Sequence, residues 1–479
     1  MGQCRPQDRA RSVGVSRSPR RREAAQPRPA NAGGVPGLPV RLTAVSILEK
    51  VLGRGVALDA LVDDRSGLPG FRDLPPRDRA LVRQIVATAL RRRGEIDAAV
   101  ARCLDRPLDR GAVRLYAILA VGAAQILFLE VADHAAVSLA VTQAGNDRQT
   151  RAAKGLVNSV LRRIARERGE LAHRPDAARL DTPDWLFERW SASYGEAAAE
   201  AIAAAHLVRA PLDLTPRIDP EAVAAATGGT ILPTGSVRVE TMPRVSTLPG
   251  YDAGAWWVQD AAAALPARLL PDLAGRRVAD LCAAPGGKTA QLAAAGALVT
   301  AVDLSPGRLR RLAGNLARLR LDAELVAADL LAWEPERTFD AVLLDAPCSA
   351  TGTIRRHPDI PWLKSPADMV SLADLQARML ARAARFVAPG GRLVYCTCSL
   401  EPEEGERQAD RFLEANPGFR LEPATADEVG GMAHFLSPAG TLRTLPSMNF
   451  GESSPAGGLD GFFAARFVNT ADSDMLGTG

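Results

Sequence analysis

Two cysteines are the residues of this chain best placed to do chemistry. Cys348 comes two residues after the apolar run AVLLDA, and Cys398 directly follows GRLVYCT; both runs are typical of buried strands. Upstream of both lies a glycine-rich turn, CAAPGGK. A cysteine thiolate is a nucleophile, and one that adds to C6 of a pyrimidine makes C5 able to accept a methyl group. The pattern therefore predicts a thiolate beside a nucleotide-like cofactor.

The elements that must position these residues begin at about residue 256, where strand, loop and helix patterns alternate. Helices are expected at 305–320 and 366–387. Apolar strands are expected at 277–283, 298–304, 323–329, 339–346 and 391–397. Such alternation predicts a parallel sheet covered by helices on both faces. Ligands bind such sheets at the carboxyl ends of the strands.

The glycine turn is compatible with several nucleotide sites. Gly286 and Gly287 permit a tight turn at a helix N-terminus, which can face a polar ligand. A Walker A loop would need glycine where Cys282 stands, and the dinucleotide motif G-x-G-x-x-G is absent. S-adenosylmethionine fits best, because acidic residues end successive strands. These are Asp303, expected at the ribose hydroxyls, Asp329, expected near the adenine amine, and Asp345.

The four cysteines of this region differ in expected role. Cys398 and Cys348 fall at the carboxyl edge of the sheet, and a nearby helix start would favour the Cys398 thiolate. Cys396 lies inside its strand and is expected in the core. The pair CTC is too close for an ordinary disulfide and lacks the second pair of ligands that zinc requires. We therefore expect no metal site.

The rest of the chain indicates several domains. Apolar residues three and four apart, with arginine opposite, predict an all-helical N-terminal domain. The expected divisions are a disordered basic tail (1–38), the helical domain (39–168), a small connecting α+β module (169–255), the α/β domain (256–469) and a flexible C-terminus (470–479). Residues 1–40 hold eight arginines, which indicates RNA affinity, a compositional bias or a targeting segment. No run suggests a membrane span, so a cytoplasmic location is expected.

Four motifs carry a family likeness. DLCAAPGGKT, DAPCSATGTIRRHPDIPW, YCTCSLEPEEGE and GLDGFFAARF resemble the RNA cytosine-5 methyltransferases, and the helical domain resembles the RNA-binding fold of NusB. In this order the two are similar to the bacterial enzymes that methylate small-subunit (16S) ribosomal RNA. The resemblance implies a Rossmann-like methyltransferase domain whose S-adenosylmethionine site comprises Cys282, Ala283, Ala284, Pro285, Gly286, Gly287, Lys288, Asp303, Asp329 and Asp345.

The same resemblance implies roles for the thiols. Cys398 would be the nucleophile, Cys348 would assist product release, and Asp345 would also contact the cytosine edge. The DNA cytosine-5 methyltransferases attack from a Pro-Cys motif, which would make Cys348 the nucleophile; the TCS motif favours the RNA arrangement.

The RNA partner is expected to present an unpaired or flipped-out cytosine, because C5 is shielded within a duplex. Basic residues near the second cysteine motif and on the last helix of the helical domain are candidates for phosphate contacts. They are Arg355, Arg356 and His357, and Lys154, Arg162 and Arg163. Two alternatives stay open: a non-catalytic RNA-binding or ribosome-assembly factor, and a C5 methyltransferase acting on another RNA such as tRNA.

Overall fold

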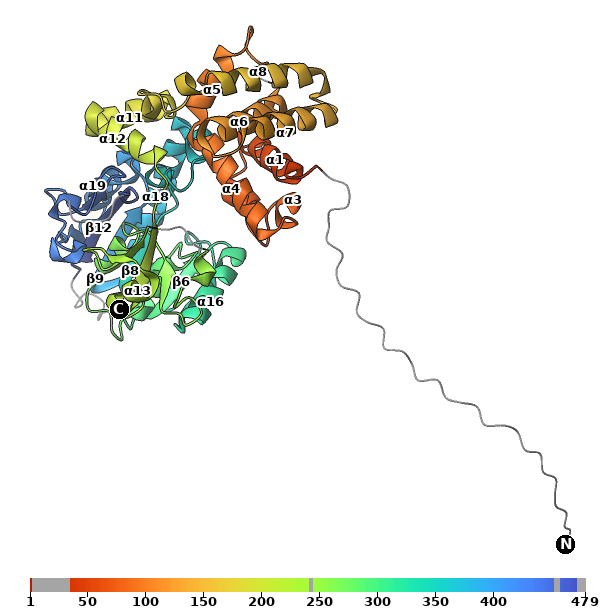
Figure 1. The fold of residues 1–479 in the computed structure, drawn as a ribbon. Helices are drawn as coiled ribbons and strands as arrows, with labels where there is room; N and C mark the ends of the chain where they lie inside the picture. Colours follow the sequence, from red (N-terminus) through yellow and green to blue (C-terminus); the bar gives the residue numbers. More distant parts are fainter. Residues whose placement is uncertain (2–34, 110, 241–243, 452–456, 472–479) are drawn as a thin grey trace.

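The structure is a computed structural model that describes Met1 and residues 35–109, 111–240, 244–451 and 457–471. The predicted basic tail and flexible C-terminus fall largely outside the described residues. Figure 1 shows a helical domain beside an α/β domain, with a smaller helical and sheet module between them in the sequence. None of the helices among the described residues is long and apolar enough for a membrane span.

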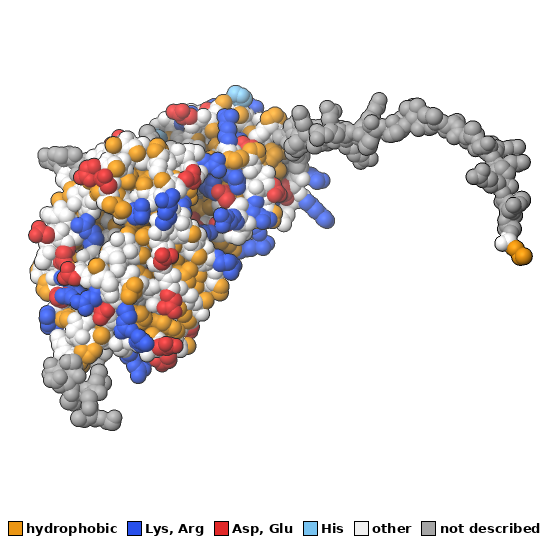
Figure 2. Space-filling model, turned by 90° about the horizontal axis from the view of Figure 1, so that it is seen from below, with side chains coloured by type: hydrophobic (Ala, Val, Ile, Leu, Met, Phe, Trp, Pro, Cys, Tyr) orange, Lys and Arg blue, Asp and Glu red, His pale blue; other side chains and the backbone are white. Residues whose placement is uncertain are grey.

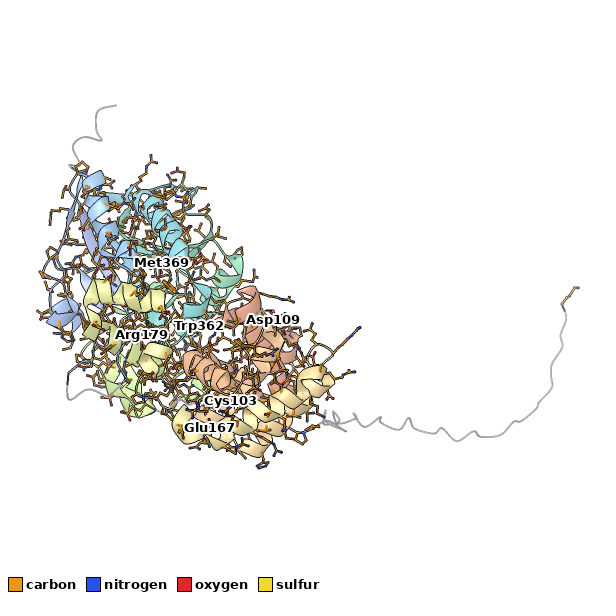
Figure 3. All side chains as sticks on the ribbon, turned by 90° about the horizontal axis from the view of Figure 1, so that it is seen from above. Cys103, Asp109, Glu167, Arg179, Trp362 and Met369 are labelled. Carbon is orange, nitrogen blue, oxygen red and sulfur yellow. The ribbon has the colours of Figure 1, made fainter. Side chains whose placement is uncertain are left out.

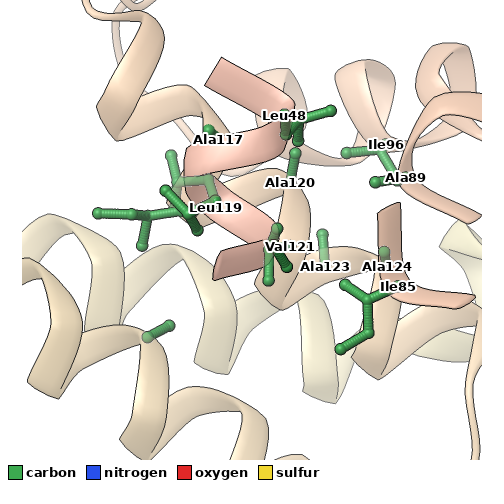
Figure 4. Close-up of a cluster of buried hydrophobic side chains, with 14 of the residues drawn as sticks. Leu48, Ile85, Ala89, Ile96, Ala117, Leu119, Ala120, Val121, Ala123 and Ala124 are labelled. Carbon is green, nitrogen blue, oxygen red and sulfur yellow. The ribbon is translucent and has the colours of Figure 1, made fainter. Parts of the chain in front are cut away.

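The helical domain is built around one central helix, α6 (Val113–Phe128). Its sequence is apolar on nearly all sides, and a helix of that kind is stable only when other helices surround it. Figure 4 shows the core that results, with Leu48, Ile85 and Ile96 packed around Ala117–Ala124 of α6. The surrounding helices are α1 (Leu38–Arg54), α4 (Pro76–Arg91), α5 (Arg93–Arg102), α7 (Asp133–Asn146) and α8 (Lys154–Arg166). Short helices α2 (Leu58–Leu61), α3 (Pro69–Arg72) and α9 (Arg168–Leu171) join them.

The connecting module has the expected mixed character. It opens with the helices α10 (Ala177–Leu180), α11 (Asp184–Tyr194) and α12 (Glu196–Leu207). Four strands in the order β2-β3-β1-β4 follow, with α13 (Pro220–Thr227) beside them. Their bounds are β1 (Leu212–Pro216), β2 (Thr230–Ile231), β3 (Val237–Val239) and β4 (Trp256–Val258). Because β4 pairs with β1, the module extends past the predicted boundary at residue 255.

The α/β domain holds an eight-stranded sheet in the order β10-β12-β9-β8-β5-β6-β7, with β11 on β12. The five predicted strands are present and parallel: β5 (Arg277–Leu281), β6 (Leu298–Asp303), β7 (Glu324–Ala327), β8 (Phe339–Asp345) and β9 (Val387–Thr397). The sheet as a whole is mixed, because the last strand runs antiparallel to β9. The added strands are β10 (Phe419–Leu421), β11 (Leu442–Thr444) and β12 (Phe462–Asn469).

Helices cover both faces of this sheet, as its apolar strands require. Side chains of α14 (Leu265–Arg268) and α15 (Gly287–Ala294) pack in the core on one face. Those of α18 (Pro366–Ala384) and α19 (Glu406–Ala415) pack in the core on the other. The remaining helices are α16 (Pro306–Leu319) and α17 (Ile360–Leu363). The carboxyl edge of the parallel strands, where their loops meet, is left for the site.

Candidate active site

The two predicted edge thiols lie against each other. Strands β8 and β9 are parallel neighbours, and Asp345 at the end of β8 is in register with Cys396 in β9. The loops that follow therefore leave the same edge of the sheet. They bring the Sγ atoms of Cys348 and Cys398 to 3.4 Å, within hydrogen-bonding distance for sulfur. Cys396 is fully buried in the core, as its place in the strand predicted.

Cys348 is held in its neutral form. The hydrogen bond to Cys398 and burial both raise the pKa of the Cys348 thiol well above its ordinary value. The S–H group of Cys348 is therefore available as a donor to the Cys398 sulfur. The helix expected to favour a Cys398 thiolate begins only at Glu406, eight residues later, so the structure gives that effect no support.

An ion pair between buried Lys288 and partly exposed Asp345 lies beside the thiols. The Lys288 Nζ donates to Asp345 Oδ2 at 2.8 Å, and Cys396 Sγ lies 3.5 Å from Asp345 Oδ1. Burial would lower the pKa of Lys288, but the charge and hydrogen bond of Asp345 raise it. Lys288 therefore stays an ammonium, and it links the glycine turn to the end of β8.

The turn has a backbone that favours glycine at Gly286, as predicted, whereas the same kind of backbone at Cys282 was not predicted. Cys282, directly after β5, has φ 61°, and Gly286 has φ 103°, both in the left-handed region that favours glycine. A Cβ on Gly286 would lie 2.7 Å from Leu312 Cγ, so a side chain there would collide with α16. Helix α15 starts at Gly287, and the amides of its first turn have no partner within the helix. These amides suit the polar part of a ligand.

The predicted carboxylates at the strand ends differ in burial and in hydrogen-bond partners. Asp303 is buried, and its oxygens accept from the backbone amides of Ala284 (3.1 Å) and Ser305 (2.9 Å), so it first of all fixes the turn. A carboxylate has about four acceptor positions, which leaves capacity for a hydroxyl. Asp329 lies two residues beyond β7, is exposed, and accepts from the Leu331 amide at 3.0 Å. A helix N-terminus with the carboxylates of Asp303 and Asp345 beside it fits the amino, hydroxyl and carboxylate groups of S-adenosylmethionine.

Arg355 and Arg356 do not have the role predicted for them, because buried carboxylates occupy their guanidinium groups. Arg355 donates to Asp260 and Asp460, each at 2.5 Å, and its side chain is 2% exposed. Arg356 donates to the same two carboxylates at 2.5 and 3.0 Å. Burial would raise the pKa of Asp260, but the two guanidiniums hold it below its ordinary value. We call these four residues the arginine cluster; the phosphate contact predicted for its two arginines is corrected.

His357 belongs to the junction with the helical domain. Its Nδ1 lies 3.3 Å from Asp59 Oδ2, which raises the pKa of His357 against the effect of burial. Trp362, labelled in Figure 3 where the helical and α/β domains meet, donates from Nε1 to the Leu90 carbonyl at 3.0 Å. The Leu58 amide donates to Asp359 at 2.8 Å. The segment after Cys348 therefore docks on the helical domain.

The candidates on α8 are more open than those of the arginine cluster. Lys154 and Arg162 are exposed, and Arg162 Nε donates to the neutral Asn158 side chain at 3.1 Å. Arg163 pairs with Glu167 at 2.9 Å, with 40% of its side chain exposed. Positive side chains are also numerous where the helical and α/β domains meet on the face seen in Figure 2. The structure therefore leaves Lys154 and Arg162 freer for phosphate than Arg163.

Sequence reasoning missed the residues that hold the two cysteine loops in place. Ser349 and Ser399, each next to a cysteine, both donate to the buried carboxylate of Glu404. Ala350 adopts φ 61°, a strained conformation for a residue other than glycine. The only sequence signal was the run of acidic residues after TCS, which by itself reads as a solvated loop.

Comparison with known proteins agrees with this geometry. Residues 267–468 match the family described as 16S rRNA methyltransferase RsmB/F, and residues 38–166 match the NusB family. The chain is 39% identical to ribosomal RNA small subunit methyltransferase B of Xylella fastidiosa strain Temecula1, over 90% of this chain and 98% of the relative. It is 36% identical to the protein of the same name from Vibrio cholerae, over 80% and 91%.

Solved structures share the fold. The crystal structure of PH0851 aligns with 91% of this chain and 99% of its own at a TM-score of 0.71 and 24% identity. NSun6 from Pyrococcus horikoshii aligns with 60% of this chain and 99% of its own at a TM-score of 0.50 and 19% identity. The chain therefore belongs to the 16S rRNA methyltransferase RsmB/F family, with an N-terminal domain of the NusB family, and its cofactor is S-adenosylmethionine.

Proposed function

We propose that this chain methylates C5 of a cytosine in small-subunit ribosomal RNA, with Cys398 as nucleophile and Cys348 as release partner. The observation that carries the proposal is the 3.4 Å separation of the two sulfurs at the sheet edge, beside Lys288 and Asp345. The names of the relatives support ribosomal RNA as the substrate.

The reaction uses the two sulfurs at this edge of the sheet. The Cys398 thiolate adds to C6, and the electron pair of the C5–C6 bond makes C5 nucleophilic. S-adenosylmethionine would supply the electrophilic methyl group for C5, and its methyl–sulfur bond would break with the electron pair left on the cofactor sulfur. The C5–H bond then breaks: its proton passes to solvent water, and its electron pair re-forms the C5–C6 double bond. The C6–S bond breaks at the same time, and its electron pair returns to the Cys398 sulfur. The neutral Cys348 S–H can donate to that sulfur as its negative charge develops.

The other site residues bind and orient. Lys288 and Asp345 form a fixed charge pair beside the thiols, and the second oxygen of Asp345 can accept from the cytosine amino group. The loop 282–288, with Asp303 and Asp329, would hold the cofactor, and Lys154 and Arg162 on α8 would contact phosphates of the RNA.

Two substitutions test the assignment of the thiols. We expect Cys398→Ala to lower methyl transfer by a factor of about 1000 or more, because no other group forms the C6 bond. We expect Cys348→Ala to accumulate an RNA–protein adduct that survives denaturing electrophoresis, because release loses its donor. Methylation by the Cys398 variant, together with loss of all adduct in the Cys348 variant, would reverse the two roles.

The substrate is tested by bisulfite sequencing of RNA from cells with and without this protein. A cytosine of small-subunit ribosomal RNA that loses its methyl group in the deletion supports the proposal. A change confined to tRNA moves the activity to another RNA, and no change at any cytosine favours the non-catalytic assembly factor.

A further inference from the structure

A single buried carboxylate joins the two cysteine loops. Glu404 is fully buried and accepts from both the backbone amide (2.9 Å) and the hydroxyl of Ser349, which follows Cys348. Oε2 of this carboxylate, the oxygen that also accepts from the Ser349 hydroxyl, accepts from the hydroxyl of Ser399, next to Cys398, at 2.5 Å. Residues from two loops 50 positions apart in the chain are thus tied to one group.

The residue that precedes each cysteine is held by the Gln376 side chain or by the Glu404 backbone. Gln376 on α18 donates to Glu404 Oε1 at 2.9 Å and to the Pro347 carbonyl, just before Cys348, also at 2.9 Å. The Glu404 carbonyl oxygen accepts from the hydroxyl of Thr397, just before Cys398, at 3.1 Å. Each cysteine therefore lies between two neighbours that Glu404 or Gln376 holds.

The chemistry of these contacts requires a carboxylate. All the partners of the Glu404 side chain are donors: one amide N–H, two hydroxyls and the Gln376 NH₂ group. An ionised carboxylate offers about four acceptor positions and no donor, which matches this set. A glutamine in its place would turn an NH₂ group toward donors and leave buried polar groups unpaired, although it has the same size.

We propose that Glu404 is a positioning residue for methyl transfer, which sets the separation of the Cys348 and Cys398 sulfurs by holding Ser349 and Ser399. This inference rests on the proposed function, in which the two thiols divide attack and release. Glu404 makes no hydrogen bond to either sulfur. It affects the positions of the sulfurs through Ser349 and Ser399 of the two loops. Its loss moves the donor S–H of Cys348 away from the sulfur it serves, so release slows more than substrate binding weakens.

The chain offers a matched control in the same loop. Glu401 is also buried, but its carboxylate accepts from Arg189 (2.5 Å) and Trp190 (3.3 Å) of α11 and from neither cysteine loop. Glu401→Gln therefore disturbs a buried carboxylate of the same strand-to-helix connection but keeps the backbone hydrogen bond from the Glu401 amide to the Ser399 hydroxyl (3.0 Å).

The experiment compares Glu404→Gln, Glu401→Gln, Ser399→Ala and Cys398→Ala in the full-length protein, with a small-subunit ribosomal RNA transcript. It measures kcat, the KM values for RNA and S-adenosylmethionine, the fraction of protein in denaturation-resistant adduct, and thermal unfolding. For Glu404→Gln we expect kcat to fall about 10- to 100-fold with both KM values nearly unchanged, since small misplacements of reacting groups cost this much. We also expect a larger adduct fraction than in the unaltered protein.

Ser399→Ala keeps the inference testable if Glu404→Gln does not fold. It removes one donor and should show the same pattern, a lower kcat with a raised adduct fraction, to a smaller degree. Equal kcat and adduct fraction in Glu404→Gln and Glu401→Gln, or in Ser399→Ala and the unaltered protein, overturns the role of Glu404. Methyl transfer by Cys398→Ala overturns the assignment of the thiols and this inference with it, whereas an inactive Cys398→Ala beside a normal Glu404→Gln overturns this inference alone.

Discussion

Arginines in two regions of this molecule look alike in the sequence but differ in burial and in pairing with carboxylates. In the arginine cluster, Arg355 is 2% exposed and lies between two buried aspartates. On α8, Arg162 is exposed and its nearest partner is a neutral asparagine. Both regions were predicted to contact RNA phosphates from their charge and their place in the chain. The difference teaches that a basic residue is available to RNA only where no internal carboxylate has already neutralised it.

The two regions also use their charges differently. The arginine cluster joins the α/β domain to its own C-terminal segment through Asp460, and it lies beside the junction with the helical domain, where Arg91 donates to the Arg355 carbonyl at 2.9 Å. Removing one charge there leaves a buried charge that the remaining partners do not balance, which is costly. On α8 the charges face solvent, so removing one changes long-range attraction and little else.

The largest effect is expected from Arg355→Ala. It leaves Asp260 and Asp460 with one arginine instead of two, and breaking a buried pair typically costs about 3 to 5 kcal/mol. Denaturant unfolding followed by tryptophan fluorescence measures the loss, with Arg162→Ala as the exposed counterpart. Equal stability of the two variants would remove the distinction between the regions.

A smaller, pH-dependent effect is expected at His206, which packs on Trp190 near the arginine cluster. Burial and the charges of Arg355 and Arg91 lower the pKa of His206 to about 3. The folded state therefore binds fewer protons than the unfolded state below the ordinary histidine pKa of about 6.5, so stability present above that pH is lost as the pH falls toward 3.

At pH 5 this linkage amounts to about 2 kcal/mol. We expect His206→Leu to lose less stability than the unaltered protein between pH 7.5 and pH 5, by about that amount. Unfolding free energies of both proteins at the two pH values give the comparison. An identical pH dependence would show that His206 is not neutral in the folded protein.

The smallest effect is expected on α8 and concerns RNA affinity alone. If Arg162 contacts a phosphate, Arg162→Ala should reduce the slope of log K against log salt by about 1. Stability should stay within about 0.5 kcal/mol, as for most surface substitutions. Arg163→Ala serves as a neighbour already paired with Glu167 and should reduce the slope less. An RNA affinity with the same salt slope in all three proteins would leave α8 without a role in binding.

Much of the α/β domain could be predicted because its signals are local. Strands β5 to β9 are short apolar runs between helices, and parallel neighbours end at the same edge. Asp345 and Cys398 could therefore be predicted at one edge of the sheet from the sequence alone. The antiparallel strand β12 was not predicted, because its apolar run does not reveal the direction in which it enters the sheet.

The partners of charged groups could not be predicted, because they come from distant parts of the chain. Arg355 meets Asp260 and Asp460, which are 95 and 105 residues away. No local pattern carries that information, so an arginine beside a candidate site is indistinguishable in sequence from one that holds two segments together.

The acidic run EPEEGE illustrates the difference between what the sequence determines and what only the tertiary structure decides. The sequence by itself determined the parallel strands, the glycine turn and the cysteines at the sheet edge, since strand periodicity and backbone sterics act over a few residues. Within that run, Glu401 pairs with Arg189, Glu404 holds the two cysteine loops, and Glu406 pairs with Arg443. Only the tertiary structure decided which carboxylate serves the thiols, because burial and the approach of distant donors arise when the whole domain packs.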